Sequence, residues 1–275
     1  MVVNANDFVF VGAANHAEND ADPQGGAIDK NVLITMFGLE MTGPDVLNME
    51  CSETLTASYR VTGRDGAGTI VTDDFAFTAE QGPVQGESGT TFHRILKVEK
   101  LTGYSPTTVP ASAVVGFFEE TSGFAVGYLY GSGRSPSGEE ITQVRRLFYG
   151  ATRPAVTSPP TVKVMYEKFF ILNGHATDSL SAGYIKRTYD PSGLCAFDIE
   201  DEVDGTESVA NRLAAPSNVL GSFDGQDKLI QDAASPPIGT LAAGEAQGVW
   251  VSLSVTHLTV AGVGQVNIQA DGSGF

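Results

Sequence analysis

One stretch near the C-terminus alternates strictly between aliphatic and other residues. From Val249 to Val255 every second residue is aliphatic, and Trp250 and two serines fill the positions between. Successive side chains of a β-strand point to opposite faces, so this period of two predicts a strand with one buried face. Trp250 is the only tryptophan and falls on the opposite face. We therefore expect it either at the rim of the core or as an apolar anchor facing a neighbour.

The same pattern recurs in short segments along the chain. Leu55–Val61 alternates cleanly and runs into Asp65-Gly66, a strong hairpin signal. Thr161–Leu172 predicts a long strand in the second half. Thr91–Leu101 fits a helix and a strand, and its strand neighbours favour a strand. Sustained helical periodicity is nearly absent, so the predicted fold class is all-β, with antiparallel β-sandwich domains and little helix.

The length of 275 residues suits two domains of ordinary size. Residues 153–160 contain three prolines, which remove ladder donors and stiffen a connection. This segment is the predicted linker. It separates an N-terminal β domain, residues 1–152, from a second β-sandwich, residues 161–275. A loop-rich N-terminal arm is expected over Asn4–Lys30.

The chain is strongly acidic. Sixteen Lys and Arg stand against 33 Asp and Glu, a net charge of −17. Phosphate backbones and anionic lipids attract Lys and Arg, so neither nucleic acid nor membrane is an expected partner. The N-terminus has no basic segment followed by a long apolar run, so no signal peptide is expected. Synthesis and folding in a cytoplasm follow from that expectation.

The two cysteines, Cys51 and Cys195, give no disulfide framework. Cys195 shares a strand face with Phe197 and Ile199, so we predict a buried free thiol there.

Metal-ligand spacing is missing among the four histidines. The acidic run Asp198–Glu207 is the best ion candidate. Counted from Glu200, Gly205 occupies the sixth position of a calcium loop, but Asn211 replaces the glutamate required at the twelfth. A solvated acidic loop is therefore favoured, with Ca²⁺ binding left open, and no metal site is predicted.

Motifs for nucleophilic catalysis or phosphate binding are also missing. The chain has no Gly-x-Ser-x-Gly elbow, and the glycine-rich Gly63–Gly68 fits a hairpin turn. Two carboxylates brought together by the fold could still serve glycoside hydrolysis. One tryptophan and 9% aromatic residues leave few platforms for a sugar. We expect no catalytic residue, no cofactor and no enzymatic activity.

Two basic pairs stand out on this acidic chain, Arg145-Arg146 and Lys186-Arg187. They are either ordinary solvent-facing strand residues or charges that complement an acidic neighbour at a subunit interface.

Eight short segments carry a further signal when they are read together. They are Val11–Asn15, Gly25–Asp29, Val61–Gly68, Thr91–Leu96, Tyr166–Asn173, Asp190–Gly193, Ala210–Arg212 and Ala243–Val251. In this combination the chain resembles virion structural proteins of tailed bacteriophages. The resemblance implies an Ig-like sandwich in the second half, presented in multiple copies on a particle, and supplies no catalytic residues.

The resemblance leads us to expect a capsid decoration (cement) protein, located on the virion. It would bind the major capsid protein and copies of itself, as a trimer or dimer. Phe8 and Phe10 are the expected anchors of an arm that orders on binding. The other expected contact residues are Arg145, Arg146, Lys186, Arg187 and Trp250. A tail, neck or fibre-base protein is the alternative within a virion, and a carbohydrate-binding module or hydrolase is the alternative from another class.

Overall fold

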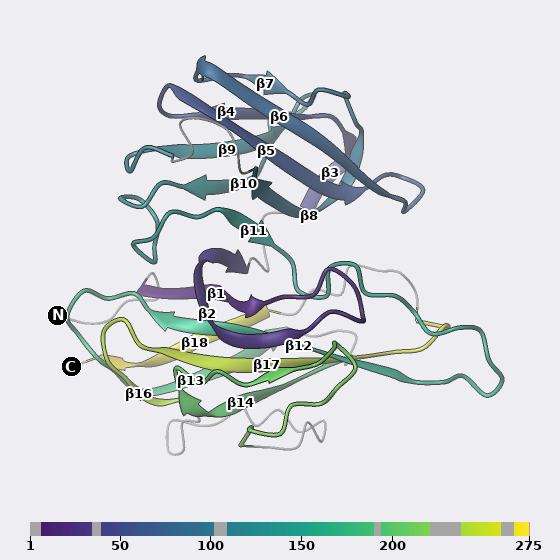
Figure 1. Ribbon diagram of the computed structural model, residues 1–275, viewed down its shortest axis with the longest axis vertical. Helices are drawn as coiled ribbons and strands as arrows, with labels where there is room; N and C mark the ends of the chain where they lie inside the picture. The colour runs from purple at the N-terminus through teal and green to yellow at the C-terminus, as the bar shows by residue number, and fades with distance from the viewer. Residues whose placement is uncertain are drawn as a thin grey trace. The chain divides into compact units, whose positions relative to one another are not determined.

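The computed structural model describes residues 7–34, 40–101, 109–189, 194–220, 238–259 and 267–274 (Figure 1). Within these ranges the regular elements are strands, β1 to β18, with no α-helix. Most neighbouring strands pair antiparallel, and β11 pairs with β2 in parallel. The predicted all-β class is confirmed.

The chain divides into two compact units that do not follow its order. The first unit contains residues 1–29 and 147–275, and the second contains residues 30–146. The units therefore do not meet at the predicted linker, residues 153–160, because that segment lies inside the first unit. The physical reason is a long-range pairing. Strand β1 (Phe8–Asn15) pairs with β12 (Lys163–Asn173), so the start of the chain folds with its second half.

The second unit is a β-sandwich. One sheet has the order β2-β11-β8-β5-β6, in which β2 takes part through Val32–Ile34 and β3 lies beside β8, and the other has the order β10-β9-β4-β7. The strands are β3 (Glu40–Asp45), β4 (Leu47–Cys51), β5 (Leu55–Arg64), β6 (Ile70–Glu80), β7 (Val84–Gln85), β8 (Phe92–Lys100), β9 (Val114–Glu119), β10 (Ala125–Tyr130) and β11 (Gln143–Arg145). The predicted strand at Thr91–Leu101 is confirmed as β8, and the Asp65-Gly66 hairpin joins β5 to β6.

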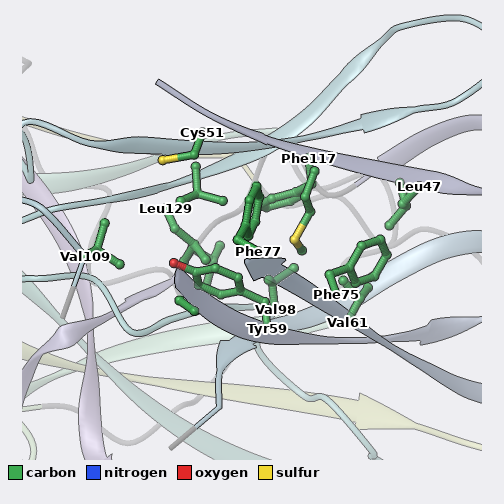
Figure 2. Packing of buried hydrophobic residues seen from close by; sticks show 14 of the residues in the cluster. Leu47, Cys51, Tyr59, Val61, Phe75, Phe77, Val98, Val109, Phe117 and Leu129 are labelled. Carbon is green, nitrogen blue, oxygen red and sulfur yellow. The ribbon is translucent and has the colours of Figure 1, made fainter. Parts of the chain in front are cut away.

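The buried faces of these two sheets share one apolar core (Figure 2). Tyr59 and Phe77 come from one sheet, with their rings edge to face at 6.1 Å between centroids. Met49, Phe117 and Leu129 come from the other and are equally buried. Each sheet turns its apolar residues inward, as the alternation predicts, although β5 also buries Ser58 and Thr62 from its other face.

The first unit also contains two sheets. One has the order β14-β17-β12-β1-β2, with β15 beside β2, and the other has the order β16-β13-β18. The remaining strands are β2 (Gln24–Ile34), β13 (Leu180–Tyr189), β14 (Cys195–Val203), β15 (Ser208–Val209), β16 (Gly239–Leu241), β17 (Ala246–Val255) and β18 (Asn267–Gly274). The chain crosses from the first unit to the second within β2.

The alternating strand at Val249–Val255 lies in β17, but the prediction of a single buried face is wrong. Residues Ala246 to Ser252 are buried without interruption, and Trp250 is fully buried. The reason is that the face of β17 that carries Trp250 is also covered, because Gly25 of β2 packs against the indole. A Cβ added to Gly25 would lie 2.8 Å from Cη2 of Trp250.

The N-terminal arm is also different from the prediction. Phe8–Asn15 is strand β1, and a second strand, β2, begins at Gln24. Between them only residues 16–23 form a loop, and residues 1–6 lie outside the described ranges. Phe8 and Phe10 are half-buried, and the ring of Phe10 lies 5.9 Å from that of Phe169. The described part of the arm is thus already ordered by sheet pairing.

Both cysteines are free thiols. Cys51 is buried, and burial raises the pKa of its thiol. Cys195 begins β14 and is half-buried, so its predicted full burial is wrong. The burial of β14 increases only from Phe197 onward.

Candidate functional site

Two adjacent charged residues in β12 point to opposite faces of its sheet. Glu167 and Lys168 are both nearly fully buried. Neighbouring residues of a strand point to opposite faces, so the two charges meet different partners. Each one lies in a separate cluster of buried charges in the first unit. The clusters are named here for their cations, Arg212 and Lys168.

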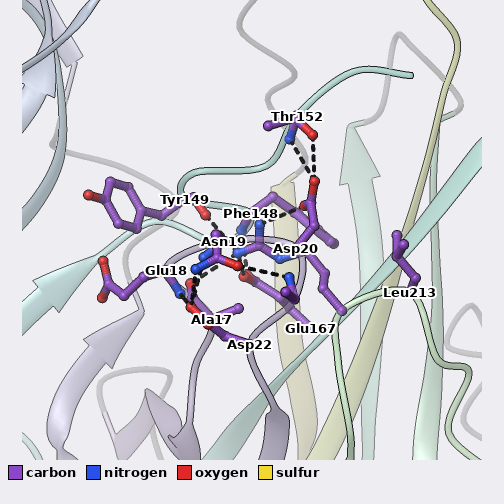
Figure 3. Close-up of polar contacts among 12 residues, drawn as sticks. Ala17, Glu18, Asn19, Asp20, Asp22, Phe148, Tyr149, Thr152, Glu167 and Leu213 are labelled. Carbon is purple, nitrogen blue, oxygen red and sulfur yellow. Dashed lines mark hydrogen bonds and ion pairs between the residues drawn. The ribbon is translucent and has the colours of Figure 1, made fainter. Parts of the chain in front are cut away.

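The Arg212 cluster ties three separated chain segments together, and Figure 3 shows Ala17, Asp20, Tyr149 and Glu167 from these segments. The Arg212 guanidinium is fully buried and donates to Glu167 Oε1 at 2.7 Å. It also donates to the backbone carbonyls of Ala17 at 3.0 Å and Tyr149 at 2.6 Å. A fourth contact, 3.2 Å long, reaches Asp20 Oδ1. A buried charge is tolerated when it is both paired and hydrogen-bonded, as here.

Asp20 extends this cluster to the surface. Its Oδ2 accepts from Lys163 Nζ and from Thr152 Oγ1, both at 2.5 Å. Lys163 Nζ also donates to the Thr152 carbonyl at 2.8 Å. Burial alone would raise the pKa of Asp20, but the hydrogen bonds from Lys163, Thr152 and Arg212 outweigh it and hold the pKa below its ordinary value of 3.8. Asp20 therefore fastens the two ends of the segment between residues 152 and 163.

That segment, Arg153–Val162, is called the Pro-rich loop below. Figure 1 shows the teal chain leaving the sheet before β12. Every residue of the loop except Pro154 is exposed, and Val156 reaches 84% and Val162 59%. Within it, the Thr161 amide donates to Thr157 Oγ1 at 3.0 Å. The loop is thus closed at its base, braced inside and open to solvent along its length.

The Lys168 cluster lies on the other face of the sheet. Lys168 Nζ contacts Glu200 Oε2 at 2.6 Å, and both side chains are fully buried. The ammonium also donates to the carbonyls of Gly26 and Gly205, each at 3.0 Å. Three donors thereby meet three acceptors. Burial lowers the pKa of Lys168, and the Glu200 carboxylate offsets part of that effect.

Glycines make room for this ion pair. A Cβ on Gly248 would lie 2.2 Å from Glu200 Oε2, and a Cβ on Gly205 would lie 2.4 Å from its Cδ. Aromatic rings complete the enclosure, since Lys168 Nζ lies 4.6 Å from the ring centre of Phe170 and 5.9 Å from that of Trp250.

The acidic run Asp198–Glu207 is solvated only in part: Asp201 to Asp204 are exposed as predicted, whereas Asp198 and Glu200 are buried. Much of it belongs to β14, where Glu200 pairs with Lys168. Asp204 Oδ1 accepts from the Ala246 amide at 2.9 Å, and Glu207 accepts from the backbone amides of residues 217 and 218. Glu200, Asp204 and Glu207 therefore have separate partners. Across the described residues, no group of three or more His, Cys, Asp or Glu side chains is placed to hold a metal ion.

The second unit carries a group of rings on its β10-β9-β4-β7 sheet, in which Tyr128 is exposed and Phe118 and Tyr130 are half-buried. Phe118, Tyr128 and Tyr130 form this aromatic face. Ring centroids lie 6.2 Å apart between Phe118 and Tyr128 and 6.4 Å apart between Tyr128 and Tyr130. Tyr128 is 40% exposed and lies opposite Gly116, where a Cβ would approach the Phe118 ring to 2.6 Å. The glycine lets the rings cover β9.

Carboxylates border the aromatic face. Glu50 lies opposite Gly116 on β4 and is exposed, so Tyr128, Gly116 and Glu50 form one row across three strands. Glu120 follows β9 directly and is also exposed. The four strands of this sheet contain no Lys or Arg.

The structure describes the side chains of five of the seven predicted contact residues, and their surroundings differ. Trp250 belongs to the core, which favours the interpretation as a core residue over that as a surface anchor. Arg145 is buried in β11, and half-buried Arg146 donates to the Ile95 carbonyl at 2.7 Å. Lys186 and Arg187 lie in β13, opposite Gln269 and Ile268 of β18, and their side chains are outside the described part.

The residues of the two clusters and the aromatic face were not predicted, and the sequence contains only weak signals for them. Lys168 stands directly before four apolar residues, Phe169 to Leu172, which is a signal for a buried charge. Tyr128 and Tyr130 are two positions apart and therefore share a strand face. Arg212 gives no local signal, because its partners come from distant parts of the chain.

In the portion of the chain that the structure describes, no helix is long and apolar enough to cross a membrane. No protein-family model matches the sequence, and no curated protein matches it either. The likeness to phage virion proteins therefore supports a proposal only.

Proposed function

We propose that this protein is a non-enzymatic structural protein of a tailed-bacteriophage virion. In this proposal it decorates the outer surface of the capsid, bound to the major capsid protein, and its second half is of the Ig-like type. The resemblance of its eight segments to virion proteins supports the proposal. So does its net charge of −17, which suits an outer surface better than contact with packaged DNA.

The observation that carries the proposal is the fixed and exposed Pro-rich loop. Asp20 joins its two ends through Thr152 and Lys163, and Val156 remains 84% exposed. An apolar side chain on a braced loop loses little conformational entropy when a protein partner covers it. Such a loop is suited to protein contact and contributes nothing to the core of its own unit.

A decoration protein stabilises a shell by mass action. If it binds the assembled lattice and not the free subunits, each bound copy lowers the free energy of the assembled state. The buried ion clusters keep the binding surface in one shape, and the many copies on a lattice add their effects.

The experiment is quantitative mass spectrometry of purified particles, with the copy number measured against the major capsid protein. Hundreds of copies per particle are expected. Tens or fewer would favour the alternative of a tail, neck or fibre-base protein. Absence of the chain from the particle would overturn both.

One observation favours a second candidate, a carbohydrate-binding module. The aromatic face has one exposed ring, Tyr128, and two half-buried rings beside Asn48 and Glu50, and sugars stack on exposed rings while polar groups bind their hydroxyls. Titration of the isolated protein with soluble oligosaccharides tests this candidate. A saturable shift that Tyr128→Ser removes would support it, and no binding would exclude these sugars.

A further inference from the structure

We propose that copies of this chain associate head to tail, with the Pro-rich loop of one copy docked on the aromatic face of the next. The two surfaces lie in different units; the loop is exposed along its length, and the aromatic face presents exposed Tyr128 beside half-buried Phe118 and Tyr130. The inference concerns the isolated protein and does not depend on the proposed function. If both hold, the contact would link neighbouring copies on the particle.

The loop has the chemistry of a ligand for an aromatic surface. Proline-rich segments bind surfaces lined with Tyr and other aromatic residues, and their limited backbone freedom lowers the entropic cost of docking. Pro154, Pro159 and Pro160 supply the rings, and Val156 and Val162 supply exposed aliphatic groups. The hydrogen bond from Thr161 to Thr157 and the contacts of Asp20 hold the loop in one conformation.

The aromatic face has the chemistry of a receptor. Tyrosines are enriched in protein interfaces because each combines a large apolar ring with a hydroxyl that can hydrogen-bond. Tyr128 and Tyr130 come from the same edge strand, β10, and Phe118 supports them from β9. Their packing over Gly116 fixes the rings before any partner arrives.

Charge identifies the occupant as a second copy. With a net charge of −17, two copies repel over most of their surfaces. The proposed contact between the loop and the aromatic face is instead attractive, because it brings opposite charges together. The loop begins with exposed Arg153, and the aromatic face is bordered by exposed Glu50 and Glu120, without a basic residue on its four strands. A neutral sugar would make no use of this complementarity.

A loop-to-face contact joins two different surfaces. Such a heterologous contact leaves a free loop at one end of every dimer and a free face at the other. Association therefore continues until a ring closes, or continues into a filament. An isologous dimer, in which both copies use the same surface, would stop at two.

The test is sedimentation velocity of the full chain over a concentration series up to about 1 mM, where weak contacts are populated. The wild type should form dimers and larger species. Val156→Asp on the loop and Tyr128→Ser on the face should each weaken association about tenfold or more. Leu258→Asp and Ile70→Asp are the matched controls, since both residues are exposed and lie outside the two surfaces. Neither should change association.

Mixing the two variants gives the sharpest result. The Val156→Asp chain keeps an intact face and the Tyr128→Ser chain keeps an intact loop. An equal mixture should therefore form one-to-one dimers that grow no further. A second pair tests charge: Arg153→Glu and Glu50→Arg should each weaken association, and the chain carrying both should recover it. This recovery would not occur if either substitution merely damaged the fold.

Three results would overturn the proposal. One is a wild type that stays monomeric throughout the series. Another is loss of association with Tyr128→Ser but not with Val156→Asp, which would assign the face to another part of the chain. The third is a monomer whose face binds an oligosaccharide, which would assign it to a sugar. Monomeric protein found in hundreds of copies on particles would leave the proposed function intact.

Discussion

The two units bury charge in different ways. In the first unit, buried carboxylates face cations: Glu200 pairs with Lys168, and Glu167 pairs with Arg212. In the second unit, the buried Asp73 accepts from the backbone amides of residues 88 and 90, each at 2.9 Å. Buried Glu119 accepts from the backbone and hydroxyl of Thr42. The second unit also has ion pairs, Lys97 with Glu99 and Lys100 with Glu140, but the carboxylate of each is only partly buried. Its most buried carboxylates hold neighbouring backbone around an apolar core.

This difference sets how each unit should fail. A buried ion pair adds little net stability, because desolvation opposes the attraction between the charges, but removal of one partner leaves the other charge exposed to an apolar interior. An apolar core loses contacts in proportion to the cavity that a substitution leaves. The first unit should therefore be sensitive to single charge changes and tolerant of paired ones.

The largest effect is expected from Lys168→Met. It leaves Glu200 buried without its cation, which should lower the free energy of unfolding of the first unit by about 3–5 kcal/mol. Fluorescence of Trp250, the single tryptophan, reports this unit during urea denaturation. The control is Lys168→Met with Glu200→Met, which should recover much of the loss. Equal losses in the single and double variants would show that the pair is not coupled.

In the second unit, Leu129→Ala removes buried methyl groups from the core. The loss should be about 2–5 kcal/mol, according to how far the site collapses. Circular dichroism at several urea concentrations measures it. Leu258→Ala, at an exposed position, should change stability by less than about 0.5 kcal/mol. A comparable loss at both positions would argue against the packing described for this core.

Gly248→Ala tests the packing around the ion pair of the first unit. The new methyl group would lie 2.2 Å from Glu200 Oε2, so the pair must shift, at a cost of about 1–3 kcal/mol. Gly66→Ala in the second unit is the control, because nothing lies within 4 Å of its Cβ position. If Gly248→Ala left the free energy of unfolding unchanged, the ion pair of Lys168 and Glu200 would have room to move.

The smallest effect is expected from Asp20→Asn, and it depends on pH. The folded pKa of Asp20 lies below its ordinary value of 3.8, so its ionised form stabilises the fold above that pH. The contribution is lost as pH falls through the folded pKa. The variant should be less stable than wild type by about 1 kcal/mol at pH 7, since nearby solvent screens the charge. The urea midpoints of variant and wild type should draw together as the pH falls below 3.8; a difference that stays constant from pH 7 into this range would contradict this origin.

Local patterns predicted the strands well, because alternation is a property of neighbouring residues. They placed β5, β8, β12 and β17 within a few residues. The division into units could not be predicted from local patterns, since the pairing of β1 with β12 joins positions far apart in the chain. The burial of both faces of β17 also depends on remote segments, namely β2 and the residues around Gly205. The Pro-rich loop was visible in the sequence, but its position inside one unit was not.

The interrupted order of the first unit has a consequence for synthesis on the ribosome. Residues 30–146 are contiguous, so the second unit can fold as soon as they emerge. Strand β1 is made first but has to wait for β12, its partner at Phe8–Gly12, until that later strand is translated. During this interval its pairing edge is unprotected, and such edges promote aggregation. A nascent chain stalled before Lys163 should therefore contain a finished second unit and an unfolded N-terminal strand.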